Sequence, residues 1–423
     1  MKQMNRTILF ICLFSFSSVR LLAQGNNSPY SLLGVGDLED NYYNRTAGLA
    51  NTGVAYRSSR FLISNNPASY SALENQFFAV EMGIRGSLVN YYGQPVSTTD
   101  HQSGDITFRR LALGIKASKH WGTSIGLVPF STQNYEFNFP TYLDGGRNEI
   151  ANSYYQGHGG INKVYWSNAY EFFKHLSVGV EASYLFGSLT QKEILQNFAS
   201  GSTLASTTRA INLSNLYMNY GLQYFGKLGK KWNYSVGATF ANQSDLYAVS
   251  SLVAMGPDST VLRSQELSQS YFTLPNTYGV GISLTRNQKY TFLADYKHQA
   301  FSDQHYETTN YSLQNSDKVS VGFELSKNQV FYNTKVEKSY FQAGLYYGSS
   351  YLQVAGKQIL DRGVTVGFGI NSLKLQNPLN YSIVLQYGIK GTQVNQLVEQ
   401  RYFNVTFSVN YRDIWYTKGR KYD

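Results

Sequence analysis

Long runs in which apolar and polar residues alternate constrain this chain more than any other feature. In residues 379–389, aliphatic or aromatic side chains occupy every second position, with Asn, Ser, Val, Gln and Gly between them. Residues 232–240, 290–297 and 403–411 repeat the pattern. Successive side chains point to opposite faces of a β-strand, whereas a helix repeats about every 3.6 residues. The alternation therefore predicts strands.

The length and number of these runs favour a membrane barrel. A tilted strand needs about 9–11 residues to cross a bilayer, whereas soluble strands commonly have about 5–6. Fourteen such runs can be counted, and single-chain bacterial barrels contain an even number of strands. The runs cover residues 76–91, 105–117, 120–139, 160–173, 175–190, 209–226, 231–246, 276–286, 289–301, 317–327, 338–353, 360–371, 378–391 and 398–412.

The alternation by itself fits two all-β folds. In a soluble sandwich the apolar faces would point inward, and in a membrane barrel they would contact lipid while the polar faces line a lumen. Aromatic residues make up 15% of the chain and repeatedly sit at strand ends, where Tyr and Trp of membrane proteins meet the headgroups. We therefore expect a transmembrane antiparallel β-barrel of about 14 strands over residues 76–416, surrounded by the lipid of a bacterial outer membrane.

The first 23 residues are typical of a secretory signal peptide. Two basic residues precede a short apolar run, residues 8–16, and Ala23 precedes Gln24 at the expected cleavage site. The apolar run is too short to span a bilayer. Cys12 is the single cysteine and would leave with this peptide, so the mature chain would have no thiol.

Residues 24–75 have a different character from the rest of the chain. They lack long alternation but contain apolar residues such as Leu32, Phe61 and Ile63. The segment could fold inside the lumen as a plug, or hatch, or it could be a flexible periplasmic tail. Its apolar content favours the plug, because disordered segments are usually poorer in apolar residues. A basic C-terminal tail, residues 417–423, follows the barrel.

The connections between the runs are predicted to be short at one end of the barrel and long at the other, as in outer-membrane barrels. Tight periplasmic turns are expected at residues 173–175, 229–231 and 287–288, and extracellular loops at residues 140–159, 191–208 and 247–275.

The sequence Asn66, Pro67 and Ala68 lies shortly before the first predicted strand, with a Gly-Val-Gly sequence at 34–36 ahead of it. Together with residues 160–179, this resembles the FadL/TodX family of outer-membrane transporters for long-chain fatty acids and other hydrophobic compounds. The resemblance implies a fourteen-stranded barrel with an N-terminal hatch. Ligand would enter from outside and leave by hatch movement or through a lateral opening in the wall. The chain departs from the family in its basic tail, because family barrels typically end on an aromatic residue.

Six predicted lumen side chains are candidates for the ligand path. The apolar ones interrupt the polar lumen pattern and would wall a pocket between hatch and barrel. The charged ones do not suit a purely apolar tunnel, so they are expected to pair with each other or to fix the hatch. The candidates are Leu185, Leu293 and Val384 among the apolar residues and Glu181, Asp295 and Lys297 among the charged residues.

No catalytic, metal or cofactor site is predicted. The Gly-x-Ser-x-Gly sequence at 122–126 lies in an alternating run without the following helix that a hydrolase nucleophile needs. The histidines lack paired zinc spacing, and the acidic cluster at 37–40 lacks calcium-loop order, so a hatch salt bridge or a solvated turn is expected there. The net charge of +10 is dispersed, which argues against nucleic-acid binding.

Two hypotheses for the function follow. The first is a channel or transporter for passive uptake of small hydrophobic molecules such as fatty acids. The second is an accessory barrel that transports nothing and binds other outer-membrane or periplasmic proteins in a secretion or assembly complex, through residues 247–275 and the basic tail. A lipid hydrolase embedded in a barrel is a third hypothesis, which a lipase assay on the purified protein would distinguish from the other two.

Overall fold

The computed structural model describes residues 28–93, 101–142, 150–197, 201–303, 311–331, 334–372 and 379–414. The predicted signal peptide, with its cleavage site at Ala23 and Gln24, and the tail at 417–423 lie outside the described residues. Within the described ranges, no helix is long and apolar enough to cross a bilayer.

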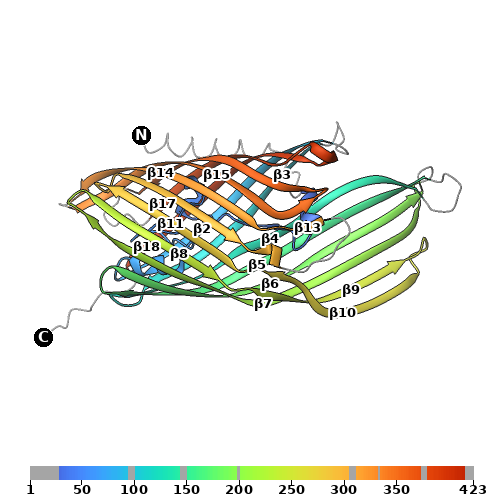
Figure 1. Ribbon diagram of the computed structural model, residues 1–423, viewed down its shortest axis with the longest axis horizontal. Coiled ribbons are helices and arrows are strands. Elements are labelled where there is room, and N and C mark those ends of the chain that lie inside the picture. Colours follow the sequence, from blue (N-terminus) through green and yellow to red (C-terminus); the bar gives the residue numbers. More distant parts are fainter. Residues whose placement is uncertain are drawn as a thin grey trace, which may run out of the picture.

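The described chain forms one large antiparallel sheet (Figure 1). Its strands are β2 (Phe77–Tyr92), β3 (Gln102–Lys116), β4 (Trp121–Tyr142), β5 (Ile150–Phe172), β6 (Leu176–Asn197), β7 (Thr203–Leu228), β8 (Trp232–Ala241), β9 (Ser244–Met255), β10 (Val261–Leu274), β11 (Thr277–Arg286), β12 (Tyr290–Gln299), β13 (Tyr311–Leu313), β14 (Ser316–Phe331), β15 (Thr334–Val354), β16 (Lys357–Asn371), β17 (Leu379–Gly391) and β18 (Glu399–Ile414).

The sheet closes into a barrel because β18 pairs with β2 along its whole length. Three wall strands are interrupted: β8 continues into β9, β10 into β11 and β13 into β14. Each interrupted strand keeps the same neighbour, since β7 pairs with both β8 and β9, and β15 pairs with both β13 and β14. The wall therefore has fourteen strands, and the predicted number is confirmed.

The burial of alternate residues confirms the membrane barrel. On β17, Tyr381, Ile383 and Leu385 are 45%, 45% and 42% exposed on the outer surface, whereas Asn380 and Val384 between them are 5% and 7% exposed. The apolar face thus points away from the enclosed interior, the opposite of a soluble sandwich. This outward apolar belt and the closed wall are those of an outer-membrane β-barrel.

The predicted tight turns are confirmed, but the predicted extracellular loops are mostly wrong. Residues 174, 229, 287 and 288 have positive φ, as tight hairpin turns require. The stretches expected to be loops instead extend the strands: β6 continues to residue 197, β7 begins at 203, and residues 244–274 form the β9–β10 hairpin. The extensions at residues 191–197 and 203–210 lack regular alternation of apolar and polar residues. Figure 1 shows the extended strands projecting to the right.

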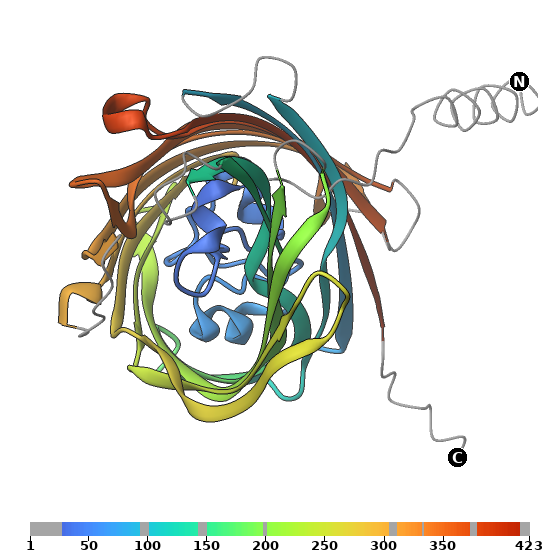
Figure 2. The same ribbon diagram turned by 90° about the vertical axis from the view of Figure 1, so that its right-hand side faces the viewer.

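The N-terminal segment, residues 28–76, lies inside the ring of strands, where Figure 2 shows it in blue. It contains the short 3-10 helices η2 (Pro29–Leu32), η3 (Arg45–Leu49) and η4 (Pro67–Ala72). The side chains of Asn44 and Asn66 cap η3 and η4 by accepting from backbone N–H groups two residues later.

Candidate functional site

The barrel wall is divided between β3 and β4. The two strands pair only where residues 111–116 of β3 lie opposite residues 122–127 of β4. The end of the barrel opposite the tight turns, where the extended strands project, is here called the long-strand end. Toward that end β3 remains paired with β2 and β4 remains paired with β5, but the described parts of β3 and β4 no longer bond to each other. The register of β4 shifts between Pro129 and Ser131, and such bulges bend a strand away from its neighbour.

The N-terminal segment occupies the edge of β4 that β3 leaves. The two-residue strand β1 (Asp37–Leu38) pairs antiparallel with residues 131–132 of β4. Backbone N–H groups of Glu39 and Ser28 also donate to carbonyl oxygens of β4, at 2.9 and 2.8 Å. Residues 28–39 therefore continue the sheet from the inside, where the adjacent wall strand is absent.

A cavity of about 440 Å³ lies beside this division. Its lining includes Thr107 from β3, Thr132 from β4 and the strand β1 between them, together with residues of β16–β18. Nine of the lining side chains are charged, five acidic and four basic. The lining therefore carries many charged groups among its apolar and neutral ones, unlike the mostly apolar pockets that usually hold small hydrophobic ligands.

The acidic cluster that the sequence places at 37–40 bonds to cations of the wall. Asp37 lies 2.6 Å from Lys390 of β17, and Asp40 lies 2.7 Å from Lys297 and 3.6 Å from Lys318. Burial favours the neutral form of Asp40, but the two ammonium groups outweigh it and hold the pKa of Asp40 below its ordinary value of 3.8. The salt-bridge interpretation of this cluster therefore matches the observed contacts.

Glu39 has a different arrangement from its two acidic neighbours. Its carboxylate lies 3.4 Å from Arg85 and 3.7 Å from Arg109, so two wall guanidiniums share one acid. The guanidinium of Arg85 also lies 5.5 Å from the centre of the Tyr43 ring. These contacts fix the turn of the N-terminal segment that follows β1.

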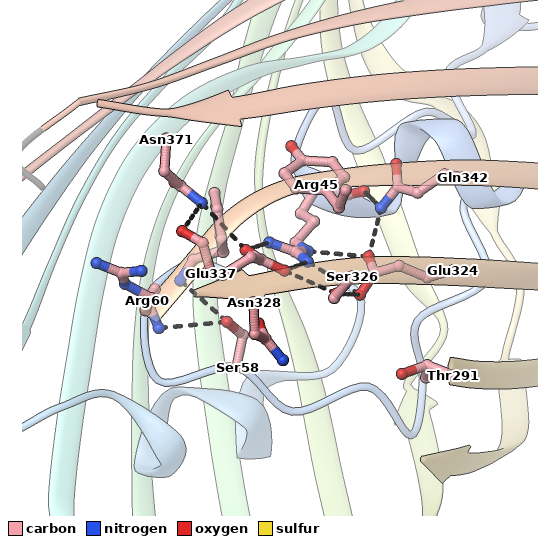
Figure 3. Close-up of polar contacts among 12 residues, drawn as sticks. Arg45, Ser58, Arg60, Thr291, Glu324, Ser326, Asn328, Glu337, Gln342 and Asn371 are labelled. Atoms are coloured by element: carbon pink, nitrogen blue, oxygen red, sulfur yellow. Dashed lines mark hydrogen bonds and ion pairs between the residues drawn. The ribbon is translucent and has the colours of Figure 1, made fainter. Parts of the chain in front are cut away.

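Closer to the tight-turn end, Arg45 of η3 joins the N-terminal segment to two wall strands (Figure 3). Its guanidinium bonds to Glu324 of β14 at 2.9 Å and to Glu337 of β15 at 2.6 Å. The rings of Phe61 and Tyr340 also contact it, with centres 4.4 and 3.9 Å away. Because the arginine side chain is only 4% exposed, these pairs are shielded from solvent.

Neutral side chains complete the hydrogen bonding of the two acids. Gln342 donates to Glu324 at 2.7 Å, and Ser326 and Asn371 donate to Glu337 at 2.7 and 3.3 Å. Gln342 also donates to the backbone carbonyl of Arg45 at 2.9 Å. The Arg45 cluster is thus a satisfied buried network rather than an open ligand site.

The Asn66, Pro67 and Ala68 motif rests against wall strands that lack side chains at that point. The Asn66 amide donates to the carbonyl of Leu222 on β7 at 3.1 Å. A methyl group added at Gly221 of β7 would lie 2.0 Å from the Asn66 Oδ1, and one added at Gly179 of β6 would lie 2.3 Å from the backbone of the motif. Glycine is therefore required at these positions for the segment to approach the wall.

The three apolar side chains predicted for the ligand path are all buried, but none lines the described cavities. Leu185 belongs to a large apolar core with Tyr30 and Val35 of the N-terminal segment. Leu293 packs in the cluster that also contains Phe61. Val384 is 7% exposed on β17. They pack inside the barrel, and a role in ligand transfer stays a prediction.

The three charged candidates lie together around a second cavity of about 150 Å³. Glu181 accepts from Lys163 at 3.0 Å. Asp295 accepts from the backbone N–H groups of residues 53 and 54 at 2.6 and 2.9 Å. Lys297 pairs with Asp40. Two of the three therefore bind the N-terminal segment directly, and Glu181 pairs within the wall.

Two kinds of chemical site, a metal centre and a hydrolase nucleophile, can be compared with the described residues. No group of three or more His, Cys, Asp or Glu side chains among them is arranged to hold a metal ion. In the Gly-x-Ser-x-Gly sequence, the Ser124 hydroxyl donates to the carbonyl of Leu113 within the wall at 2.9 Å. Neither Arg45 nor Gly221 belongs to a sequence motif, so only their tertiary contacts distinguish them.

Solved structures support the FadL-type fold. The toluene transporter TodX of P. putida has 14% sequence identity with this chain and a TM-score of 0.59, with 90% of this chain and 100% of that chain covered. The toluene transporter TbuX of Ralstonia pickettii has 14% identity and a TM-score of 0.56, covering 87% and 97%. A Pseudomonas aeruginosa FadL homologue has 12% identity and a TM-score of 0.56, covering 88% and 98%.

Comparison at the level of sequence identifies the family. A search of curated proteins finds no match. The model of the BamG family matches residues 4–423, nearly the whole chain. The resemblance to FadL/TodX transporters therefore holds for the fold, and by sequence the chain belongs to the BamG family.

Proposed function

We propose that this protein is an outer-membrane channel for small, partly hydrophobic molecules, in which residues 28–39 close a lateral passage between β3 and β4. The observation that carries the proposal is the divided wall beside the larger cavity, with β1 bonded to the free edge of β4. The pairing of β1 with β4 spans two residues of each strand, and the ion pair of Asp37 with Lys390 also holds β1 in place. Release of both contacts would connect the cavity with the outer surface of the barrel.

The side chains that line the cavity indicate which kinds of molecule could pass through it. Charged side chains of both signs surround it, and burying unpaired polar groups against an apolar ligand is unfavourable. We therefore expect molecules with a polar group as well as an apolar part, fatty acids among them, to pass more readily than plain hydrocarbons.

A disulfide that locks β1 onto β4 tests the proposal. Leu38 and Ser131 are directly opposite partners in this pairing, and opposite residues of antiparallel strands are about 4.5–5.5 Å apart at Cα, within the range of a disulfide. The double variant Leu38→Cys/Ser131→Cys should lose uptake of labelled oleate and toluene when oxidised and regain it after dithiothreitol. Unchanged uptake by the oxidised variant would overturn the proposal.

A second disulfide is the matched control. Thr285 and Thr291 are opposite partners on the β11–β12 hairpin, with hydroxyl oxygens 3.0 Å apart. The variant Thr285→Cys/Thr291→Cys links two strands that are already paired, so its oxidation should leave uptake unchanged.

The accessory-barrel hypothesis is the second candidate, and a separate observation favours it. The N-terminal segment is held by ion pairs to several wall strands and by an apolar core around Tyr30 and Val35. A barrel that only binds partner proteins would still bind them when the disulfide of the Leu38→Cys/Ser131→Cys variant holds β1 on β4. Co-purification of partners at fixed stoichiometry from cells carrying the oxidised Leu38→Cys/Ser131→Cys variant, together with normal growth, would support this hypothesis.

A further inference from the structure

The tight-turn end of the barrel carries an arc of exposed cations, here called the basic rim. It consists of Lys174, Lys230, Lys231, Arg286, Lys289 and Lys327, all exposed and all in or beside the short hairpin turns. None of the six forms an ion pair within the described residues, whereas lumen cations such as Arg45, Arg110 and Lys163 each have a carboxylate partner.

Acidic side chains near the same turns do not balance the basic rim. Glu171 lies 3.6 Å from Arg57 of the N-terminal segment, and Glu74 lies 2.5 Å from Arg412. Asp413 accepts from the hydroxyl of Tyr411 at 2.7 Å. Two of these acids already pair with arginines outside the basic rim, and the one remaining carboxylate does not balance six cations, so the basic rim presents a net positive charge to its surroundings.

The basic rim lies at the edge of the lipid-facing surface. Arg286 is four residues beyond Ile282 on β11, and Lys327 is six residues beyond Val321 on β14. Ile282 and Val321 face outward, with 44% and 43% exposure. Even spacing along a strand keeps side chains on one face, so both cations extend from the outer surface.

Aromatic side chains accompany these cations. The Arg286 guanidinium lies 5.6 Å from the centre of the Trp232 ring, and the Lys289 ammonium lies 4.9 Å from that of Tyr290. Phe173, at the tip of the β5–β6 turn, is 87% exposed. Aromatic rings with Lys and Arg beside them mark the headgroup level of membrane proteins, so the cations of the basic rim lie where lipid headgroups are expected.

We infer that the basic rim binds anionic phospholipid in the periplasmic leaflet, with the phosphate groups of phosphatidylglycerol or a similar lipid as its ligands. Guanidinium and ammonium groups form charge-assisted hydrogen bonds with phosphate oxygens, and clustered cations at a membrane surface attract anionic lipid. The cations lie on hairpins from β5 to β14, which make up seven of the fourteen wall strands. Their place at the edge of the lipid-facing surface, beside aromatic rings, favours lipid over an acidic protein as the ligand.

The experiment compares two matched double variants of the full-length protein in nanodiscs of phosphatidylethanolamine and phosphatidylglycerol. Arg286→Gln/Lys289→Gln removes two cations of the basic rim. Arg263→Gln/Lys357→Gln removes one exposed Arg and one exposed Lys at the long-strand end. Both variants should retain the heat-modifiable migration of a folded barrel, and native mass spectrometry measures the phosphatidylglycerol retained after detergent extraction.

We expect the wild type and the long-strand-end variant to retain phosphatidylglycerol over phosphatidylethanolamine. The variant of the basic rim should retain about threefold less phosphatidylglycerol, and high salt should weaken retention in all three proteins. Equal retention by the two variants would overturn the inference. So would an acidic protein that is lost from the variant of the basic rim while lipid retention is unchanged.

Discussion

Arg45 of the N-terminal segment donates two parallel hydrogen bonds to Glu324 on β14, with Nε 3.0 Å from Oε2 and Nη2 2.9 Å from Oε1. The same guanidinium donates to both oxygens of Glu337 on β15, at 2.8 and 2.6 Å. One arginine of the N-terminal segment thus bonds to four carboxylate oxygens of two adjacent wall strands.

Replacing Arg45 by Ala should therefore destabilise the barrel strongly, because two buried carboxylates would lose their cation. Breaking a buried pair from one side typically costs about 3–5 kcal/mol. The Arg45→Lys variant should be more stable than Arg45→Ala but less stable than wild type, since lysine keeps the positive charge but cannot form the parallel hydrogen bonds. Urea unfolding in detergent measures the free energy of unfolding of each variant.

Arg401→Ala is the control for this prediction. Arg401 pairs with Glu399 at 2.8 Å, but its side chain is 42% exposed, and exposed pairs contribute about 0–1 kcal/mol. Equal losses in the two alanine variants would contradict the role assigned to Arg45.

Adding one methyl group to the wall should displace the N-terminal segment. In Gly221→Ala the new Cβ would lie 2.0 Å from the Asn66 side chain, whereas in Gly86→Ala its nearest neighbours are 3.9 Å away. Limited proteolysis of the folded barrel should therefore cleave residues 28–76 in the first variant and spare them in the second. If residues 28–76 resist cleavage in both variants, the wall strands must have shifted to accommodate the methyl group while the segment stayed in place.

A disulfide between Ser71 and Ser177 should stabilise the barrel. The two hydroxyl oxygens are 2.7 Å apart, both residues are buried, and 106 residues separate them in the sequence. Closing a loop of that size contributes about 3–5 kcal/mol when the geometry is unstrained. The oxidised Ser71→Cys/Ser177→Cys variant should unfold at higher urea concentration than the same protein in dithiothreitol. A lower midpoint after oxidation would mean that the segment sits differently in the wall.

The ion pair of Asp40 should contribute stability that depends on pH. Because the wall lysines lower the pKa of Asp40, its contribution is present above the ordinary aspartate pKa and is lost as pH falls through the lowered value. Wild type should therefore be more stable than Asp40→Asn at neutral pH, and the difference should shrink below about pH 4. Melting temperatures measured across this range check the sign, and a constant difference would refute it.

The strand pattern could be predicted from the sequence because it depends on local periodicity. Lipid contacts every second residue of a membrane strand, so the alternation around Tyr381 and Ile383 is visible without any knowledge of neighbours. For the same reason, the sequence predicts loops where the strands extend beyond the regular alternation. There the strands are held by backbone pairing with their neighbours, which does not require a particular side-chain period.

The charged candidates could be predicted because they lie on the polar, lumen-facing side of alternating strands, but the individual residues that they contact could not be. Asp295 meets backbone N–H groups 241 and 242 residues away, and Lys297 meets Asp40 257 residues away. Closure of the barrel brings these groups together. The residues around each group in the sequence do not indicate which distant residue will lie beside it.

By itself, the sequence determined the class of fold, the number of wall strands and their lipid-facing sides, since each follows from residues adjacent in the chain. Only the tertiary structure decided that β1 replaces β3 beside β4, that Arg45 bonds to two wall acids, and that Gly221 leaves room for Asn66. These features depend on which strand lies next to which and on the space that remains between packed surfaces. Both quantities exist only once the barrel has closed around its N-terminal segment.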